Sequence, residues 1–148
     1  MTDLEAALRF NPSVLPVLGA EVFRQAGCDK LPSALAVCHF DCAMEIGVLD
    51  ATRMLQEAMK VPVTGEMDSL TQTRALTTPE KDNVGMYIAL REKRYYAQAR
   101  AVPAQAATLG KSVGRLADLR AYIRRHYPLV AKDWGKEKYS VEPYYGPR

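Results

Sequence analysis

Apolar positions recur with a helical period along most of the chain, most clearly between Pro32 and Gly47. Apolar residues three and four positions apart fall on one side of a helix, and further apolar residues extend this surface around most of it. A helix that is apolar on nearly all sides is central to a core. We therefore predict a buried central helix that ends at Gly47, with the main stripe formed by Leu31, Leu35, Cys38, Cys42 and Ile46.

Capping residues and prolines predict the helices on either side. Thr2 followed by Glu5 forms a capping box for a short first helix. Gly27 is a natural stop for a second helix that begins at about Pro16. After the central helix, Asp50 is predicted to cap a helix over residues 51–60.

The second half of the chain predicts three more helical segments. Asp68 caps a short helix over residues 69–76, and Thr78 with Pro79 opens a long helix that reaches about Ala101. Residues 104–114 are predicted to be a loop or frayed turn, and a last helix covers about residues 115–127.

Strand signals are almost absent, so the predicted fold is all-α: a lobe of about five to seven helices over residues 1–127. Residues 128–148 contain three prolines, two glycines and four large aromatic residues with no helical period. This tail either packs back on the domain or is disordered, or it is a docking arm for a partner. The candidate docking residues are Trp134, Tyr139, Tyr144 and Tyr145.

Composition limits the classes of function. A chain of 148 residues with 48% apolar and 25% charged residues fits one globular domain, and a net charge of +3 is too mild to indicate a nucleic-acid partner. No signal peptide and no apolar run long enough to span a membrane are present. We therefore expect synthesis in the bacterial cytoplasm, followed by association with a virion or cell-envelope assembly. No cofactor is expected.

Three cysteines do not describe a disulfide framework. Cys28, Cys38 and Cys42 are predicted to be small buried thiols. The alternative is a metal site formed by these thiols with His39, although no standard ligand spacing is present. His39 and His126 are otherwise interpreted as structural or exposed.

Asp41 and Glu45 are the candidate catalytic acids, because they are carboxylates on a helix that its apolar pattern predicts to be buried. Glycosidases place two carboxyl groups about 5 Å or more apart, on either side of a sugar. Residues four apart on one helix point the same way instead. We therefore expect Asp41 to accept backbone N–H groups of a neighbouring loop, and Glu45 to pair with Arg53, Arg91 or Arg94.

Several motifs occur in the order of a known lysozyme family. The first motif is Cys28–Asp29 with Leu31–Pro32, and the predicted helix after it carries an F-D-x-A pattern. An L-Q-x-A pattern and a turn with a glycine come next. The residues that match in these later motifs are Phe40, Asp41, Ala43, Gly47, Ala51, Leu55, Gln56, Ala58, Val61 and Gly65. Together with "LREKRYYAQ" and "TLGKSVGRLADL", these residues resemble the second half of the glycoside hydrolase family 108 lysozymes, a predicted peptidoglycan-binding domain. The resemblance covers about residues 17–125.

The departures from that family affect the expected function. Its catalytic glutamate stands in an N-terminal E-G-G-Y motif, and the chain has nothing like this before the matched region. Glu45 replaces the family asparagine, Val113 replaces a tryptophan, and the turn has diverged to "TGEMDSLTQ". The resemblance thus implies a non-catalytic, lysozyme-derived module that binds other subunits of a phage tail or baseplate, or of a lysis or injection machine. The alternatives are a peptidoglycan hydrolase with displaced acids and a peptidoglycan-binding accessory protein.

Overall fold

The computed structural model describes residues 1–132 and 134, and this part of the chain is helical with no strand. The all-α fold class is therefore confirmed. The elements are α1 (Asp3–Phe10), α2 (Pro16–Gln25), η1 (Cys28–Lys30), α3 (Ser33–Ile46), α4 (Val48–Met59), α5 (Ser69–Thr77), α6 (Glu80–Ala101), η2 (Pro103–Gln105) and α7 (Ala106–His126).

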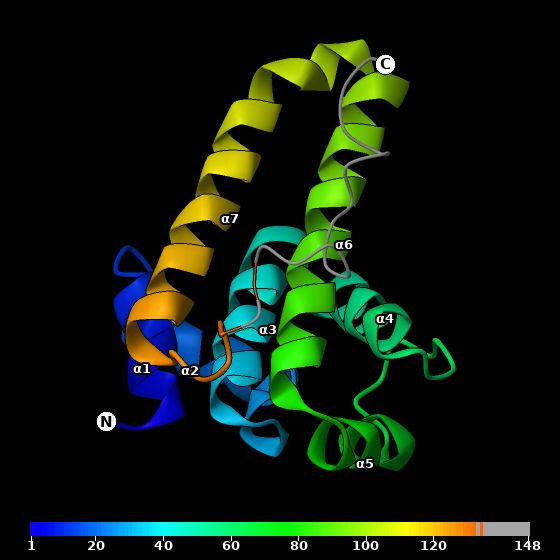
Figure 1. The fold of residues 1–148 in the computed structure, drawn as a ribbon. Helices are drawn as coiled ribbons and strands as arrows, with labels where there is room; N and C mark the ends of the chain where they lie inside the picture. The colour runs from blue at the N-terminus through cyan, green and yellow to red at the C-terminus, as the bar shows by residue number, and fades with distance from the viewer. Residues whose placement is uncertain (133, 135–148) are drawn as a thin grey trace.

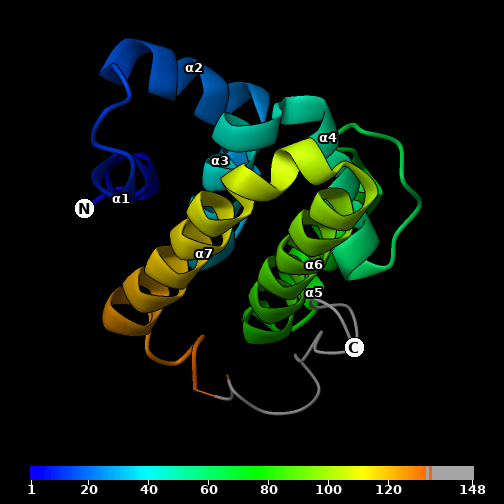
Figure 2. The ribbon, with the colours of Figure 1, turned by 90° about the horizontal axis from the view of Figure 1, so that it is seen from above.

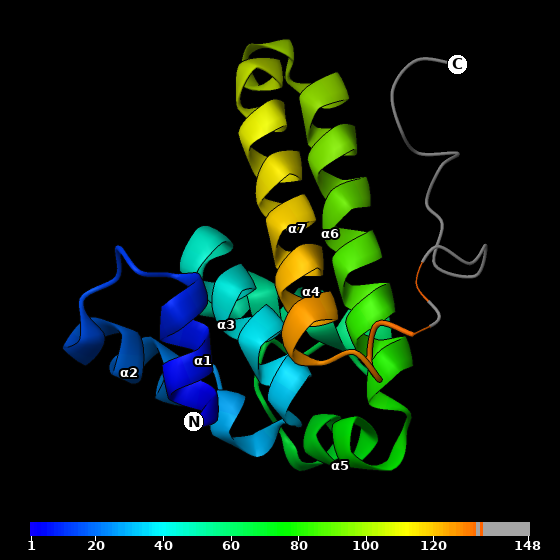
Figure 3. The ribbon, with the colours of Figure 1, turned by 60° about the vertical axis from the view of Figure 1, so that its left-hand side comes forward.

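Helix α3 is the centre of the fold, as its apolar pattern predicted. Every residue from Ala34 to Ala43 is buried. Helices α1 and α2 lie on one side of α3 and α4 lies on the other, while α5 lies at the foot of α6 (Figures 1 and 2). Helices α6 and α7 run antiparallel and form a hairpin that projects beyond the rest of the molecule (Figures 1 and 3).

Several local signals act as the sequence predicts. The Thr2 hydroxyl accepts the Glu5 N–H, and the Asp68 carboxylate accepts the Thr71 N–H at 2.9 Å. Gly27 follows α2 with φ of +70°, a left-handed conformation that glycine adopts at little cost. A Cβ atom on Gly27 would also lie 2.6 Å from the Met67 side chain, so both backbone and packing require glycine here.

Two predicted helix starts are wrong by a few residues. Asp50 does not cap α4, because the helix begins at Val48 directly after Gly47 and Asp50 lies in its first turn. Thr78 is not the N-cap residue of α6, because Pro79 occupies that position and has no side-chain acceptor. The Thr78 hydroxyl instead donates to the Arg74 carbonyl at the end of α5.

The predicted loop over residues 104–114 is also wrong. Only Pro103–Gln105 forms a short 3-10 turn, and α7 then runs without a break from Ala106. Its buried residues, Leu116, Leu119 and Ile123, all lie in the second half of the helix. The first half belongs to the projecting hairpin, and its apolar residues Leu109 and Val113 are only partly buried.

A cap that the sequence did not indicate begins the central helix. Pro32 occupies the N-cap position of α3 and has no side-chain acceptor. Glu80, at the start of α6, supplies a carboxylate oxygen that accepts the N–H groups of Ala34 at 2.8 Å and Leu35 at 3.1 Å. This contact satisfies two of the free N–H groups at the helix start and joins α3 to α6.

The chain beyond α7 packs back on the domain as far as the structure describes it. Val130 is buried, and the Trp134 ring lies against the core with the Arg124 guanidinium 5.5 Å from its centre. Trp134 is the one predicted docking residue within the described part of the chain. Tyr139, Tyr144 and Tyr145 lie outside the described residues. Among the helices described, none has the length and apolar character needed to cross a bilayer.

Candidate functional site

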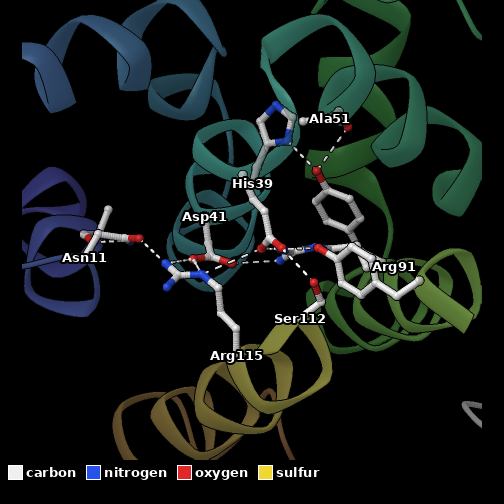
Figure 4. Close-up of polar contacts among 11 residues, drawn as sticks. Asn11, His39, Asp41, Ala51, Arg91, Ser112 and Arg115 are labelled. Atoms are coloured by element: carbon white, nitrogen blue, oxygen red, sulfur yellow. Dashed lines mark hydrogen bonds and ion pairs between the residues drawn. The ribbon is translucent and has the colours of Figure 1, made fainter. Parts of the chain in front are cut away.

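The two candidate acids meet two arginines at the junction of three helices. Asp41 and Glu45 come from α3, Arg91 from α6 and Arg115 from α7 (Figure 4). We call these four residues the ion-pair network. Asn11, just after α1, extends it by accepting a hydrogen bond from Arg115.

Asp41 is fully buried and both of its oxygens are taken by arginines. Arg91 Nη1 donates to Oδ2 at 2.9 Å, and Arg115 Nε donates to Oδ1 at 2.8 Å. The prediction that Asp41 accepts backbone N–H groups of a loop is therefore wrong, because its hydrogen-bond donors are the guanidinium groups of Arg91 and Arg115. The reason is that α7 continues past this point and brings Arg115 over the central helix.

Glu45 pairs with Arg91, one of the three partners that the sequence allowed. Arg91 Nη2 donates to Glu45 Oε2 at 3.0 Å, and Arg115 Nε lies 3.7 Å from the same oxygen. The Glu45 side chain remains 24% exposed. It lines a surface hollow of about 290 Å³ together with Arg115, Met44 and Asn11.

The geometry of the ion-pair network does not match a glycosidase pair. One guanidinium, that of Arg91, contacts both carboxylates, so these two groups face a shared partner and not the two sides of a sugar. Two carboxylates and two guanidiniums also balance in formal charge. Balanced pairing of this kind is how proteins accommodate charges that are removed from water.

A second buried polar cluster surrounds His39. Its Nε2 lies 3.0 Å from the Ala26 carbonyl oxygen, and its Nδ1 lies 2.8 Å from the Tyr87 hydroxyl, which also reaches the Ala51 carbonyl at 3.0 Å (Figure 4). Because the Ala26 carbonyl only accepts, the neutral imidazole carries its hydrogen on Nε2, and Nδ1 is left as an acceptor. The single hydroxyl hydrogen of Tyr87 is therefore shared between His39 Nδ1 and the Ala51 carbonyl. His39 is therefore structural, one of the two roles that the sequence suggested.

Burial sets the protonation state of His39. Removal from water disfavours the charged imidazolium and lowers the pKa of His39 to about 4, although its hydrogen bond to the Ala26 carbonyl acts in the opposite direction. The nearby Arg91 guanidinium lowers this pKa further.

The three cysteines are buried free thiols, as predicted. Burial raises the pKa of Cys28, Cys38 and Cys42, which keeps them in the unreactive thiol form. Within the described part of the chain, no group of three or more His, Cys, Asp or Glu side chains could hold a metal ion.

The loop between α4 and α5 is organised by Gln56. The two amide hydrogens of this buried side chain are shared among Thr64 Oγ1, the Glu66 carbonyl and Thr71 Oγ1. Its oxygen accepts the N–H groups of Thr64 and Gly65 at 2.9 Å each. Gly65 has φ of +84°, and a Cβ atom there would lie 2.5 Å from Leu49. Gln56 and Gly65 thus fix this loop.

Helices α4 and α6 border a cleft of about 640 Å³ on another face of the molecule. Its apolar lining comes from Ile46, Met54, Ala97 and Ala101. Its charged lining consists of two ion pairs, Asp50 with Arg53 and Glu57 with Arg94. We call this the α4/α6 cleft.

Sequence reasoning did not find Arg115, Asn11 or Tyr87 as site residues. Arg115 is 74 positions from Asp41, and only the turn between α6 and α7 brings the two together. The available signal was weak: Arg115 comes just before the buried Leu116, so it sits at the edge of the apolar face of α7.

Comparisons with protein-family models, curated proteins and solved structures found no match to this chain.

Proposed function

We propose that the protein is a non-catalytic helical module that serves as a structural and interaction component of a larger assembly. The lysozyme-like motifs favour a phage tail or baseplate, or a related lysis or injection machine, as the setting. The observation that carries the non-catalytic part is the burial of Asp41 between Arg91 and Arg115. A general acid must come within hydrogen-bond reach of the substrate atom that it protonates, and a buried, doubly paired carboxylate has no such access.

One observation favours a second candidate, a peptidoglycan hydrolase that uses Glu45. This carboxylate borders the 290 Å³ hollow and is partly exposed, so a sugar could approach it. Against this role, Glu45 shares Arg91 with Asp41, and no second free carboxylate faces it across the hollow among the residues that line it.

Digestion of purified peptidoglycan tests the two candidates. The full chain is incubated with insoluble peptidoglycan and released muropeptides are separated by chromatography, with an active lysozyme as positive control. We expect no release above buffer. Release that disappears in Glu45→Gln but persists in Glu21→Gln, a matched change at an exposed glutamate of α2, would establish the hydrolase instead.

Co-sedimentation with the same material tests the accessory role. A peptidoglycan-binding protein would pellet with insoluble peptidoglycan at low salt and leave the pellet as salt increases. The proposed module stays in the supernatant under both conditions.

A further inference from the structure

The surface hollow beside Glu45 is large enough for a small molecule. Its lining comes from the loop between α1 and α2, the end of α3 and the middle of α7, and consists of Asn11, Ser13, Val14, Met44, Glu45 and Arg115. We call it the Glu45 hollow. Because a water-sized group occupies about 30 Å³, a volume of about 290 Å³ holds a ligand of about nine or ten non-hydrogen atoms.

Two opposite charges lie side by side at the Glu45 hollow, and solvent reaches both. Arg115 Nε is 3.7 Å from Glu45 Oε2, and the two side chains are 37% and 24% exposed. A ligand with a single charge is attracted by one of these groups and repelled by the other. A ligand that carries a positive and a negative charge can be attracted by both. The charges of the hollow therefore favour a zwitterion.

Both charged groups have hydrogen-bonding capacity that the protein does not use. Arg115 reaches from α7 toward Asp41 and Asn11 and donates to them from Nε and Nη2, and among the described residues no acceptor contacts its Nη1 (Figure 4). The Glu45 Oε1 atom is contacted by Ser112 Oγ at the long distance of 3.4 Å. The exposed Ser13 adds a hydroxyl group to the same lining. The hollow thus offers a ligand both donors and an acceptor.

The α-amino and α-carboxylate groups of an amino acid match this arrangement. They are attached to one carbon atom, so the two charges of the ligand are neighbours, as the charges of Glu45 and Arg115 are. The ammonium group can donate to Glu45 while the carboxylate accepts from Arg115. Hydrogen bonds between charged groups are about twice as strong as neutral ones, so this pairing uses the strongest contacts that the hollow has.

The apolar part of the lining selects the side chain of the ligand. Val14 and Met44 are both half-buried and border the hollow. Contact with an aliphatic side chain would remove their apolar surface from water. A neutral sugar is a poorer match, because it places hydroxyl groups against these two residues and brings no charge to Glu45 or Arg115.

We propose that the Glu45 hollow binds a zwitterionic α-amino acid with an aliphatic side chain. The ammonium group pairs with Glu45, and the carboxylate pairs with Arg115 and the Ser13 hydroxyl. The aliphatic side chain contacts Val14 and Met44. A bound ligand would hold the α1–α2 loop and α7 against the end of α3. This inference does not depend on the proposed function, because a module without catalysis can still hold a small ligand.

Titration of the full-length, isotopically labelled chain with L-leucine at neutral pH, followed by nuclear magnetic resonance, tests the proposal. We expect saturable shifts of the Ser13 and Val14 amides and the Met44 methyl group, with a dissociation constant on the order of 1 mM. N-acetyl-leucine lacks the ammonium charge and leucine amide lacks the carboxylate. Each should bind about tenfold more weakly than leucine, because each loses one contact between charged groups.

Glu45→Gln isolates the contact with the ammonium group. This variant should bind leucine about tenfold more weakly than wild type and no longer prefer leucine over N-acetyl-leucine, while the preference over leucine amide remains. Glu21→Gln, a matched change at an exposed glutamate of α2, should change none of these affinities.

Val14→Ser tests the aliphatic contact and leaves the ion-pair network intact. It should weaken leucine binding several-fold and leave glycine binding unchanged, because glycine has no side chain to lose the contact. Val17→Ser is the matched control, since Val17 is an exposed valine that does not line the hollow.

Two results would overturn the proposal. One is leucine that causes no saturable shift at the Glu45 hollow, or that binds there no better than both of its singly charged derivatives. The other is saturation of the same resonances by N-acetylglucosamine and not by leucine, which would assign the hollow to a sugar. Neither result decides whether the protein cleaves peptidoglycan, which the digestion experiment measures separately.

Discussion

Protonation of His39 is predicted to destabilise the protein between neutral and acidic pH. The imidazole is buried, and Nε2–H already donates to the Ala26 carbonyl while Nδ1 accepts from Tyr87. A second proton would place a positive charge in the core near the Arg91 guanidinium. The folded state therefore resists the proton that the unfolded chain accepts readily.

The size of the effect follows from the difference in pKa between the two states. The ordinary pKa of histidine is 6.5, and that of His39 in the folded protein is lowered to about 4. Between these values the unfolded state binds more protons, so stability decreases as pH falls through the window. A difference of about 2.5 pKa units corresponds to about 3 kcal/mol, fully present above pH 6.5 and lost near pH 4.

Chemical denaturation at a series of pH values measures this directly. His39→Gln keeps an amide donor and acceptor but does not titrate, so its stability deficit relative to wild type should shrink by about 3 kcal/mol from pH 7.5 to pH 4. Carboxylates titrate in both proteins and cancel in the difference. His126→Gln removes an exposed imidazole and serves as the matched control. Parallel curves for wild type and His39→Gln across this range would refute the reasoning.

Three further sets of contacts can be tested by substitution. Arg91→Met leaves Asp41 buried with one partner fewer and should cost about 3 to 5 kcal/mol in denaturation; Asp41→Asn should cost much less in that background than in wild type, and additive costs would contradict the pairing. Gln56→Ala should cost about 2 to 3 kcal/mol and speed amide hydrogen exchange across residues 64–71, and unchanged exchange there would be evidence against its organising role. Glu80→Ala should cost about 1 kcal/mol through the lost cap, whereas Glu80→Gln, which keeps an acceptor oxygen, should cost less; equal losses would contradict the capping contact.

Periodicity predicted the helices that bury an apolar stripe and did not predict the first half of α7, where no side chain is fully buried. Helix α3 carries apolar residues on every side, so its position and its end at Gly47 could be read directly. The first half of α7 contains Gly110 and Gly114, which usually weaken a helix, and a Cβ atom added at either would meet no neighbour within 4 Å. Its helical state depends on continuity with the buried second half and on the adjacent α6, which no local pattern records.

The sequence predicted only one contact of the candidate site, the pairing of Glu45 with an arginine near the end of α3. Glu45 needed a cation there, and Arg91 was one of three plausible choices. Asp41 was assigned the wrong kind of partner because its second arginine, Arg115, reaches it only through the α6–α7 hairpin. Contacts between residues far apart in sequence depend on the angles at which the helices cross. Local sequence patterns do not reveal these crossing angles.

Charge balance gives a physical reason for a carboxylate at position 45. With asparagine there, two guanidiniums, Arg91 and Arg115, would share the single carboxylate of Asp41. Glu45→Asn should therefore cost about 1 to 2 kcal/mol, less than a fully buried pair because the side chain is partly exposed.

The same reasoning predicts how a second change would act. Arg115→Gln removes the excess positive charge, so it should cost less in the Glu45→Asn background than in wild type, with a coupling above about 0.5 kcal/mol in a double-mutant cycle followed by denaturation. Additive costs would mean that Glu45 does not serve to balance Arg115, and the carboxylate at the surface hollow would again need another explanation. A measured coupling would identify Glu45 as the charge that lets a second arginine, and with it α7, dock on the central helix.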